Sequence, residues 1–158
     1  MPTPEERANA IARLRSLPDQ LEAAVRGLTA EQLTTAFMPN EWTVAQNVHH
    51  VADAHMNVFV RFKLILLEDR PMLKPFDQND WAETVDATGA DISTSLGIIR
   101  GIHLRWADLM DTLDESDWSR AGNHPERGAI TLDDLLDYYS EHGYLHIQQI
   151  NDTLAARG

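Results

Sequence analysis

The chain has 158 residues, enough for one domain with its own buried core, so we read residues 1–158 as a single domain. Its formal net charge of −12 and sequence pI near 4.8 disfavour nucleic acid and anionic membranes as partners, because their phosphate groups would be repelled. The sequence has no cysteine, which excludes a disulfide framework and a thiolate metal site and means that any thiol nucleophile must come from outside the chain.

The N-terminal sequence, MPTPEERANAIARLRSLPDQ, is charged and amphipathic and lacks the apolar stretch of a signal peptide. No run of residues approaches the ~20 apolar residues that a membrane-spanning helix needs. We therefore expect a cytoplasmic protein.

The first predicted long helix covers residues 4–26, where apolar side chains recur at spacings of three and four. Pro18 lies inside it and predicts a kink, and Gly27 ends it. A short helical turn is expected at residues 29–33.

The second predicted long helix has Thr43 as its N-cap and continues until Pro71. Residues 71–89 mix prolines and acids and read as a long connection with one helical turn around Trp81. The length of this connection suits a crossover between helices that are not adjacent antiparallel neighbours.

The third predicted helix covers residues 91–113, and a loop follows in which only residues 128–130 hint at extended chain. The fourth opens at Thr131, where TLDD resembles a capping box. Its inward stripe consists of Leu132, Leu135, Leu136, Tyr139, His142, His146 and Ile150. The pattern predicts an all-α fold, a four-helix bundle with a long crossover between the second and third helices.

His142 and His146 stand four apart on the fourth predicted helix, so their rings can reach one metal ion. The alternative is a structural pair bonded to backbone carbonyls or to a tyrosine. The intervening residues are Gly143, Tyr144 and Leu145, so the glutamate base of a His-Glu-x-x-His protease is missing.

A third histidine ligand is expected from the second helix, which carries His49, His50 and His55. Periodicity leaves the choice open, although it favours His55 at the centre of the apolar stripe over His50 on its flank. Both have structural alternatives, as a core histidine and as a polar residue lining a cleft. Three neutral imidazoles leave a coordination position open, as in catalytic zinc sites, where the ion lowers the pKa of a bound water or thiol.

Several segments together resemble the DinB superfamily, and its YfiT/BstA branch most closely. The resemblance begins with EWTVAQNVHHVADAHMN at residues 41–57 and RFK at 61–63. It continues through KPFDQNDW at 74–81, HLRW at 103–106, His124-Pro125, ITL at 130–132 and the pair His142 and His146. It therefore extends over nearly the whole chain.

The resemblance implies a four-helix bundle whose metal is held by one histidine of the second helix and two of the fourth. In that family the ligand of the second helix stands eight residues after the motif tryptophan. Counting from Trp42 selects His50, and the implied metal ligands are therefore His50, His142 and His146. His55 then becomes a packing residue or a support for a ligand, and His103, His124 and the tryptophans are read as structural.

The family resemblance also implies a metal-dependent S-transferase that joins a low-molecular-weight thiol, similar to bacillithiol, to an electrophile. Arg61 and Asn57 are candidate contacts to a carboxylate or sugar of the thiol. Zinc is the first choice of metal, with nickel, iron and manganese as alternatives. A homodimer is left open.

Two other functions compete with the transferase. One is a metal-dependent hydrolase in which metal-bound hydroxide attacks the substrate. The other is a noncatalytic, stress-related binding protein whose histidines only stabilise the bundle.

Overall fold

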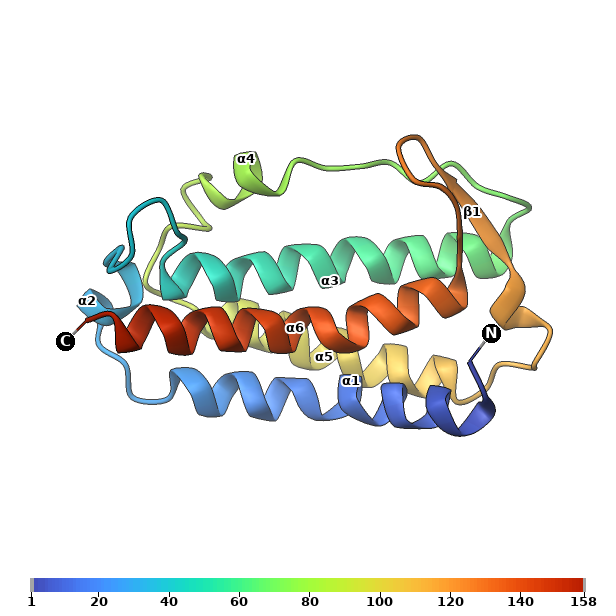
Figure 1. The fold of residues 1–158 in the computed structure, drawn as a ribbon, viewed down its shortest axis with the longest axis horizontal. Coiled ribbons are helices and arrows are strands. Elements are labelled where there is room, and N and C mark those ends of the chain that lie inside the picture. The colour runs from blue at the N-terminus through green and yellow to red at the C-terminus, as the bar shows by residue number, and fades with distance from the viewer. Residues whose placement is uncertain (1, 158) are drawn as a thin grey trace.

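A computed structural model describes residues 2–157, which fold into a bundle of long helices (Figure 1). The bundle consists of α1 (Pro4–Val25), α3 (Val44–Leu67), α5 (Ser93–Met110) and α6 (Leu132–Ala155). The shorter elements are α2 (Ala30–Thr34), α4 (Gln78–Ala82), the 3-10 turn η1 (Asp117–Ser119) and the strands β1 (Ala121–His124) and β2 (Gly128–Thr131). The predicted four-helix bundle is confirmed, and the structure adds the turn η1 and the antiparallel hairpin that pairs Ala121 with Thr131.

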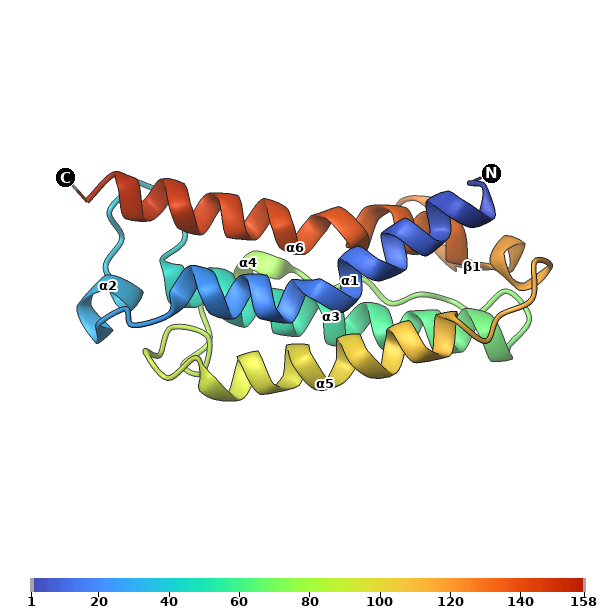
Figure 2. The ribbon, with the colours of Figure 1, turned by 90° about the horizontal axis from the view of Figure 1, so that it is seen from below.

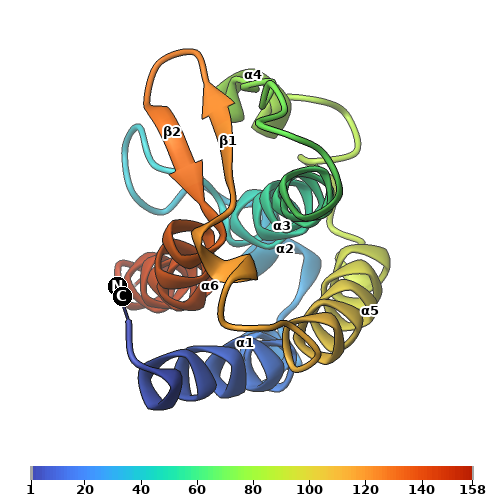
Figure 3. The ribbon, with the colours of Figure 1, turned by 90° about the vertical axis from the view of Figure 1, so that its right-hand side faces the viewer.

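Each long helix has two neighbours in the bundle. Helix α1 packs on α5 and α6, and α3 packs on the same two helices, so α1 and α3 lie diagonally opposite each other (Figure 3). Helices α3 and α5 run in the same direction side by side (Figures 1 and 2). The chain must therefore return along the whole bundle between them, and the segment that contains α4 makes this return. The predicted crossover is thus a connection between parallel neighbours.

Threonine caps set the starts of four helices. Thr3, Thr29, Thr43 and Thr131 each accept a hydrogen bond from the backbone N–H three residues on, and the side chain at that position bonds back to the threonine N–H. Such capping boxes satisfy two backbone donors that a helix start leaves free. Helix α5 has no side-chain cap of this kind, and it is shorter than the predicted 91–113.

The apolar core falls into two clusters, which share the long helices. Phe62, Trp106 and Leu136 belong to one cluster, and Val48 and Ile99 belong to the other. On α5 and α6 the buried histidines stand between the residues of the two clusters, and on α3 they lie on both sides of the boundary between Ala52 and Ala54, so a polar layer crosses the core. No helix within residues 2–157 has the combination of length and apolar character needed to cross a membrane.

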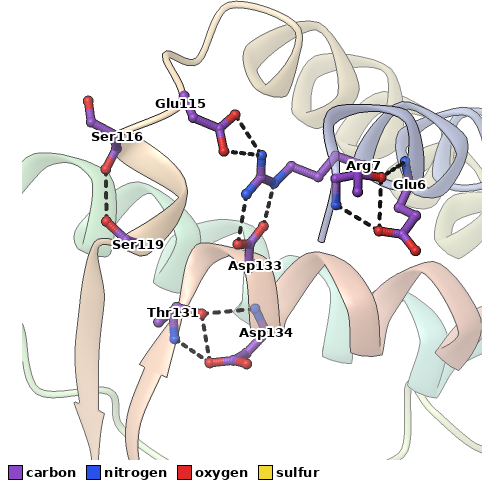
Figure 4. A network of polar contacts seen from close by, with 9 residues as sticks. Glu6, Arg7, Glu115, Ser116, Ser119, Thr131, Asp133 and Asp134 are labelled. Carbon is purple, nitrogen blue, oxygen red and sulfur yellow. Dashed lines mark hydrogen bonds and ion pairs between the residues drawn. The ribbon is translucent and has the colours of Figure 1, made fainter. Parts of the chain in front are cut away.

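Arg7 closes one end of the bundle (Figure 4). Its buried guanidinium donates to both carboxylate oxygens of Asp133, at 2.6 and 3.0 Å, and to Glu115 at 2.8 Å. These contacts join the first turns of α1 and α6 to the loop after α5. Because charge-assisted bidentate bonds have a strict geometry, they hold the start of α6 in register with α1.

Candidate metal centre

Three histidine side chains from two packed helices converge in the polar layer. His50 projects from α3, and His142 and His146 project from successive turns of α6. The Nε2 atom of His142 lies 3.4 Å from His50 Nε2 and 3.2 Å from His146 Nε2. The three side chains are 3%, 7% and 7% exposed, respectively, so the cluster is almost closed to solvent.

This spacing fits one small divalent cation. Zinc–nitrogen bonds of ~2.0–2.1 Å in a tetrahedral arrangement place neighbouring nitrogen atoms about 3.3 Å apart, and the two Nε2 separations are 3.2 and 3.4 Å. Within residues 2–157, these three histidines are the only group of at least three His, Asp or Glu side chains whose ligand atoms converge to within 4.8 Å. The donor set therefore fits a three-histidine metal site with a free position.

Asn47 determines which nitrogen of His146 is available to a metal. The Asn47 amide nitrogen donates to the Thr43 carbonyl at 3.0 Å, which identifies the other amide atom, Oδ1, as an acceptor. His146 Nδ1 lies 2.9 Å from this oxygen and must carry the proton. The Nε2 lone pair of His146 is then free and faces the other two rings.

Burial keeps the clustered histidines neutral. Desolvation, with a smaller contribution from nearby histidines, lowers the pKa of His50 and of His142 to about 3. Desolvation also lowers the pKa of His146 to about 4, and a hydrogen bond with Gln149 opposes this shift by a smaller amount. Because a metal binds neutral imidazole, protons compete for these nitrogen atoms only in acid.

The other histidines of α3 do not join the cluster. His55, which periodicity favoured, is fully buried and lies behind His142, with its Nε2 3.1 Å from His142 Nδ1. His49 points away, and its ring nitrogen atoms contact Ser95 Oγ and the Gly89 carbonyl. The structure thus brings together the three histidines that the family resemblance selected.

Two cavities meet at the cluster. One, of about 580 Å³, is named here the tryptophan cavity and is lined by Met38, Asn40, Glu41, Trp42, Asn47, Gln78, Asn79, Tyr138, His142, Leu145, His146, Gln149, Asp152 and Thr153. The other, of about 640 Å³, is the arginine cavity, whose lining includes His50, Ala54, Arg61, Phe76, Gln78, His124, Glu126, Arg127, Asp134, Tyr138, Tyr139 and His142. His50 lines only the arginine cavity and His146 only the tryptophan cavity, whereas His142 lines both.

The two cavities differ in charge. Arg61 and Arg127 give the arginine cavity two guanidinium groups, although Glu126 and Asp134 also line it. The tryptophan cavity contains the carboxylates of Glu41 and Asp152 and no arginine or lysine. An anionic group is therefore better accommodated in the arginine cavity.

Of the two predicted contacts to the thiol, Arg61 lies at a cavity and Asn57 does not. Arg61 lines the arginine cavity, where it also donates to the Lys74 carbonyl. Asn57 donates to the Asp53 carbonyl and is not among the lining residues of either cavity. His124, read as structural, lines the arginine cavity near the hairpin turn.

Sequence reasoning missed Trp42 and Tyr138 as residues of the site. The Trp42 ring packs against His50 at a centroid distance of 4.7 Å and against His146 at 6.1 Å. The Tyr138 ring lies 5.5 Å from that of His142 and lines both cavities. Tyr138 stands one helical turn before His142, and this spacing was a usable signal.

Comparison with known proteins places the chain in a family. Residues 13–150 match the sequence profile of the DinB superfamily. A protein of Geobacillus thermodenitrificans named "Putative metal-dependent hydrolase" is 45% identical over 150 residues, which cover 94% of this chain and 84% of that protein. "Putative metal-dependent hydrolase YfiT" of Bacillus subtilis is 39% identical over 149 residues, with the same two coverages.

A solved structure shares the fold. The structure of YfiT from Bacillus subtilis superposes on this chain with a TM-score of 0.93. That protein is described as "a probable metal-dependent hydrolase with an unusual four-helix bundle topology". The two sequences are 38% identical, and the match covers 97% of this chain and 88% of that one. The parallel neighbours α3 and α5 belong to this shared topology.

Proposed function

This chain belongs to the DinB superfamily, and we propose that it is a metal-dependent S-transferase that joins a low-molecular-weight thiol to an electrophile. In this proposal His50, His142 and His146 hold one divalent cation, with zinc as the first choice and nickel, iron or manganese as alternatives. The cation supplies Lewis acidity, which lowers the pKa of a thiol or water that reaches the open position.

The observation that carries the proposal is the junction of two cavities at the histidine cluster. A reaction between two separate molecules needs both to reach one point from different directions. The shared lining by His142, Gln78 and Tyr138 supplies such a point. Hydrolysis has water as its second reactant and does not require a second cavity of this size.

The charges suggest which molecule enters which cavity. Low-molecular-weight thiols such as glutathione carry carboxylates, and the arginine cavity holds two guanidinium groups that can bind them. Arg61 and Arg127 then orient the thiol so that its sulfur faces His50 and His142. The electrophile occupies the tryptophan cavity, where Trp42 and Leu145 offer apolar surface.

The chemistry is a displacement or an addition at carbon. The thiol loses its proton to solvent, and its sulfur lone pair forms a new carbon–sulfur bond. With a halide substrate, the carbon–halogen bond breaks and the halide leaves with the bonding electrons. With an epoxide, a carbon–oxygen bond opens and the oxygen takes up a proton. The chain supplies no cysteine, which is consistent with an external thiol as nucleophile.

Metal-dependent hydrolysis is the second candidate, and the names of the relatives favour it. It requires only a water at the open position and one substrate in either cavity. Within residues 2–157, no carboxylate hydrogen-bonds to His50, His142 or His146, so a carboxylate base for hydrolysis would have to come from the cavity linings. The second cavity, which hydrolysis does not require, ranks hydrolysis below thiol transfer.

The test measures both reactions with the same zinc-loaded protein. A panel of bacillithiol, mycothiol, glutathione and cysteine is combined with monochlorobimane, and p-nitrophenyl acetate is supplied separately without thiol. We expect fluorescent conjugate with at least one thiol and its loss in His50→Ala. Arg61→Gln should raise the KM for the thiol and leave the KM for the bimane unchanged. Ester cleavage without thiol, together with no conjugate from any thiol, would overturn the proposal in favour of hydrolysis.

A further inference from the structure

A row of three buried rings lies behind the metal-facing atom of His142. His142 Nδ1 is 3.1 Å from His55 Nε2, and His55 Nδ1 is 2.6 Å from His103 Nε2. His103 Nδ1 in turn is 2.6 Å from the Leu14 carbonyl oxygen. The row therefore starts at α6, passes through α3 and α5, and ends on the backbone of α1.

The Leu14 carbonyl at the end of the row determines which ring nitrogen carries the proton in each of the three histidines. A carbonyl oxygen can only accept, so His103 Nδ1 carries a proton and its Nε2 has a lone pair. That lone pair requires a proton on His55 Nδ1 and leaves His55 Nε2 as an acceptor. His142 must then be protonated on Nδ1. Its Nε2 lone pair is consequently free, and it faces His50 and His146.

Pro18 explains why the Leu14 carbonyl is available in the middle of a helix. In an α-helix this oxygen would accept from the N–H four residues later, which is position 18. Proline has no N–H, so α1 leaves the Leu14 carbonyl without its helical partner. Pro18, for which a kink was predicted, therefore also leaves the Leu14 carbonyl free to accept a hydrogen bond from His103.

The geometry and burial of the rings agree with this assignment. The planes of His55 and His103 are within 14° of parallel and their centroids lie 4.8 Å apart, a geometry that allows an in-plane N–H···N bond. Both side chains are 0% exposed, so water does not compete for their nitrogen atoms. A charged imidazole at this depth would be strongly desolvated, which favours neutral rings with one donor and one acceptor each.

We propose that His55 and His103 are positioning residues, which hold His142 in the tautomer that binds metal by linking its Nδ1 proton to the Leu14 carbonyl. A partner on the second ring nitrogen of a metal-binding histidine fixes both ring orientation and tautomer. His146 has a separate and shorter link through Asn47 to the Thr43 carbonyl. His142 is thus linked to the Leu14 carbonyl of α1, and His146 is linked to the Thr43 carbonyl at the start of α3. The inference rests on the metal site of the proposed function and is independent of the reaction.

The direct test is 15N NMR of the histidine rings in metal-free wild-type protein. We expect His55, His103 and His142 each to carry the proton on Nδ1 and to have an unprotonated Nε2. A proton on Nε2 of His55 or His142 would overturn the proposal. This measurement needs neither metal nor activity, so it stands apart from the test of the proposed function.

The second test compares zinc affinity in matched variants. His103→Phe removes the acceptor for His55 and should weaken zinc binding by about 10- to 100-fold, whereas His103→Gln offers a carbonyl oxygen and should recover most of the affinity. His49→Phe is the control, because this buried histidine also has two polar partners but does not contact His142. It should lower the free energy of unfolding without a matching loss of zinc affinity.

Two results of the affinity comparison would contradict the proposal. One is wild-type zinc affinity in folded His103→Phe, and the other is an equal loss of affinity in His103→Phe and His103→Gln. If His103→Phe does not fold, the tautomers seen by NMR and the zinc affinity of His103→Gln decide whether the proposal holds. Absence of zinc binding by the wild type would instead reject the metal site itself.

Discussion

Gly143 of α6 lies directly against Leu17 of α1. A Cβ atom on this glycine would overlap Leu17 Cδ2 and lie 2.8 Å from Leu17 Cδ1. Leu17 is fully buried, so its side chain has little room to move away. The glycine therefore allows α1 and α6 to approach closely at the point where α6 carries His142 and His146.

The close approach predicts that Gly143→Ala lowers the free energy of unfolding by about 1–3 kcal/mol, as overpacking a core does. Gly101→Ala on α5 is the control, because nothing lies within 4 Å of the added Cβ there. That variant should be stabilising by up to ~1 kcal/mol, since alanine favours helix more than glycine does. Urea unfolding of the two variants measures both effects, and stabilisation by Gly143→Ala would show that the helices do not pack as described.

Removal of the buried arginine should be costly. Arg7→Met leaves the Asp133 carboxylate buried without its partner, so we expect a loss of about 3–5 kcal/mol in the free energy of unfolding. Arg100→Met removes an arginine whose side chain is 39% exposed and pairs with Asp19 and Glu22. This control should cost about 1 kcal/mol or less. Similar midpoints for the two variants in urea would contradict the role of Arg7 in closing the bundle.

Acid should destabilise the metal-free protein more steeply than its carboxylates alone would. Burial lowers the pKa of His50 and His142 to about 3 and of His146 and His103 to about 4, whereas unfolded histidine has a pKa of about 6.5. Below pH ~6.5 the unfolded chain binds protons that the native protein excludes, so stability falls as pH falls. Above that pH both states are neutral at these histidines and the effect vanishes.

The free energy of unfolding should fall by up to about 1.4 kcal/mol per pH unit for each proton that the native protein excludes. Urea unfolding of metal-free protein between pH 7 and pH 4.5 measures it. His142→Gln removes one such group and should make the slope shallower. An unchanged slope in this variant would mean that His142 is not held neutral by burial.

Loss of the Asn47 side chain should weaken metal binding. Asn47→Ala removes the acceptor for His146 Nδ1, and we expect zinc affinity to fall by about 10- to 100-fold. Gln46→Ala is the neighbouring control, because Gln46 donates to the Ala82 carbonyl and makes no hydrogen bond to a clustered histidine. Competition with a chromophoric chelator gives both affinities. Equal values for Asn47→Ala and the wild type would show that the Asn47 bond does not orient His146.

Much of the fold could be predicted from the sequence because the helices are amphipathic and clearly capped. Threonine caps and helical spacing located the starts of α1, α3 and α6 closely. The hairpin at residues 121–131 was hardly visible, because its two strands have four residues each and no clear alternation. The end of α5 was placed too late, since no glycine or proline stands directly after Met110 to mark it.

The site was predictable only in part. The spacing of His142 and His146 was sufficient to propose a metal pair, but the choice between His50 and His55 needed a family resemblance. Both residues are buried on inward sides of α3, and only the position of α6 decides which ring meets the pair. The row from His142 to Leu14 joins four helices, and no local pattern encodes contacts over such separations.

The most direct test of the metal site is an anomalous difference map from crystals of the protein loaded with zinc. We predict one strong peak, bonded to the Nε2 atoms of His50, His142 and His146, with His55 behind it and not bonded to the ion. A peak on His55, or no peak at the three histidines after zinc loading, would contradict the account.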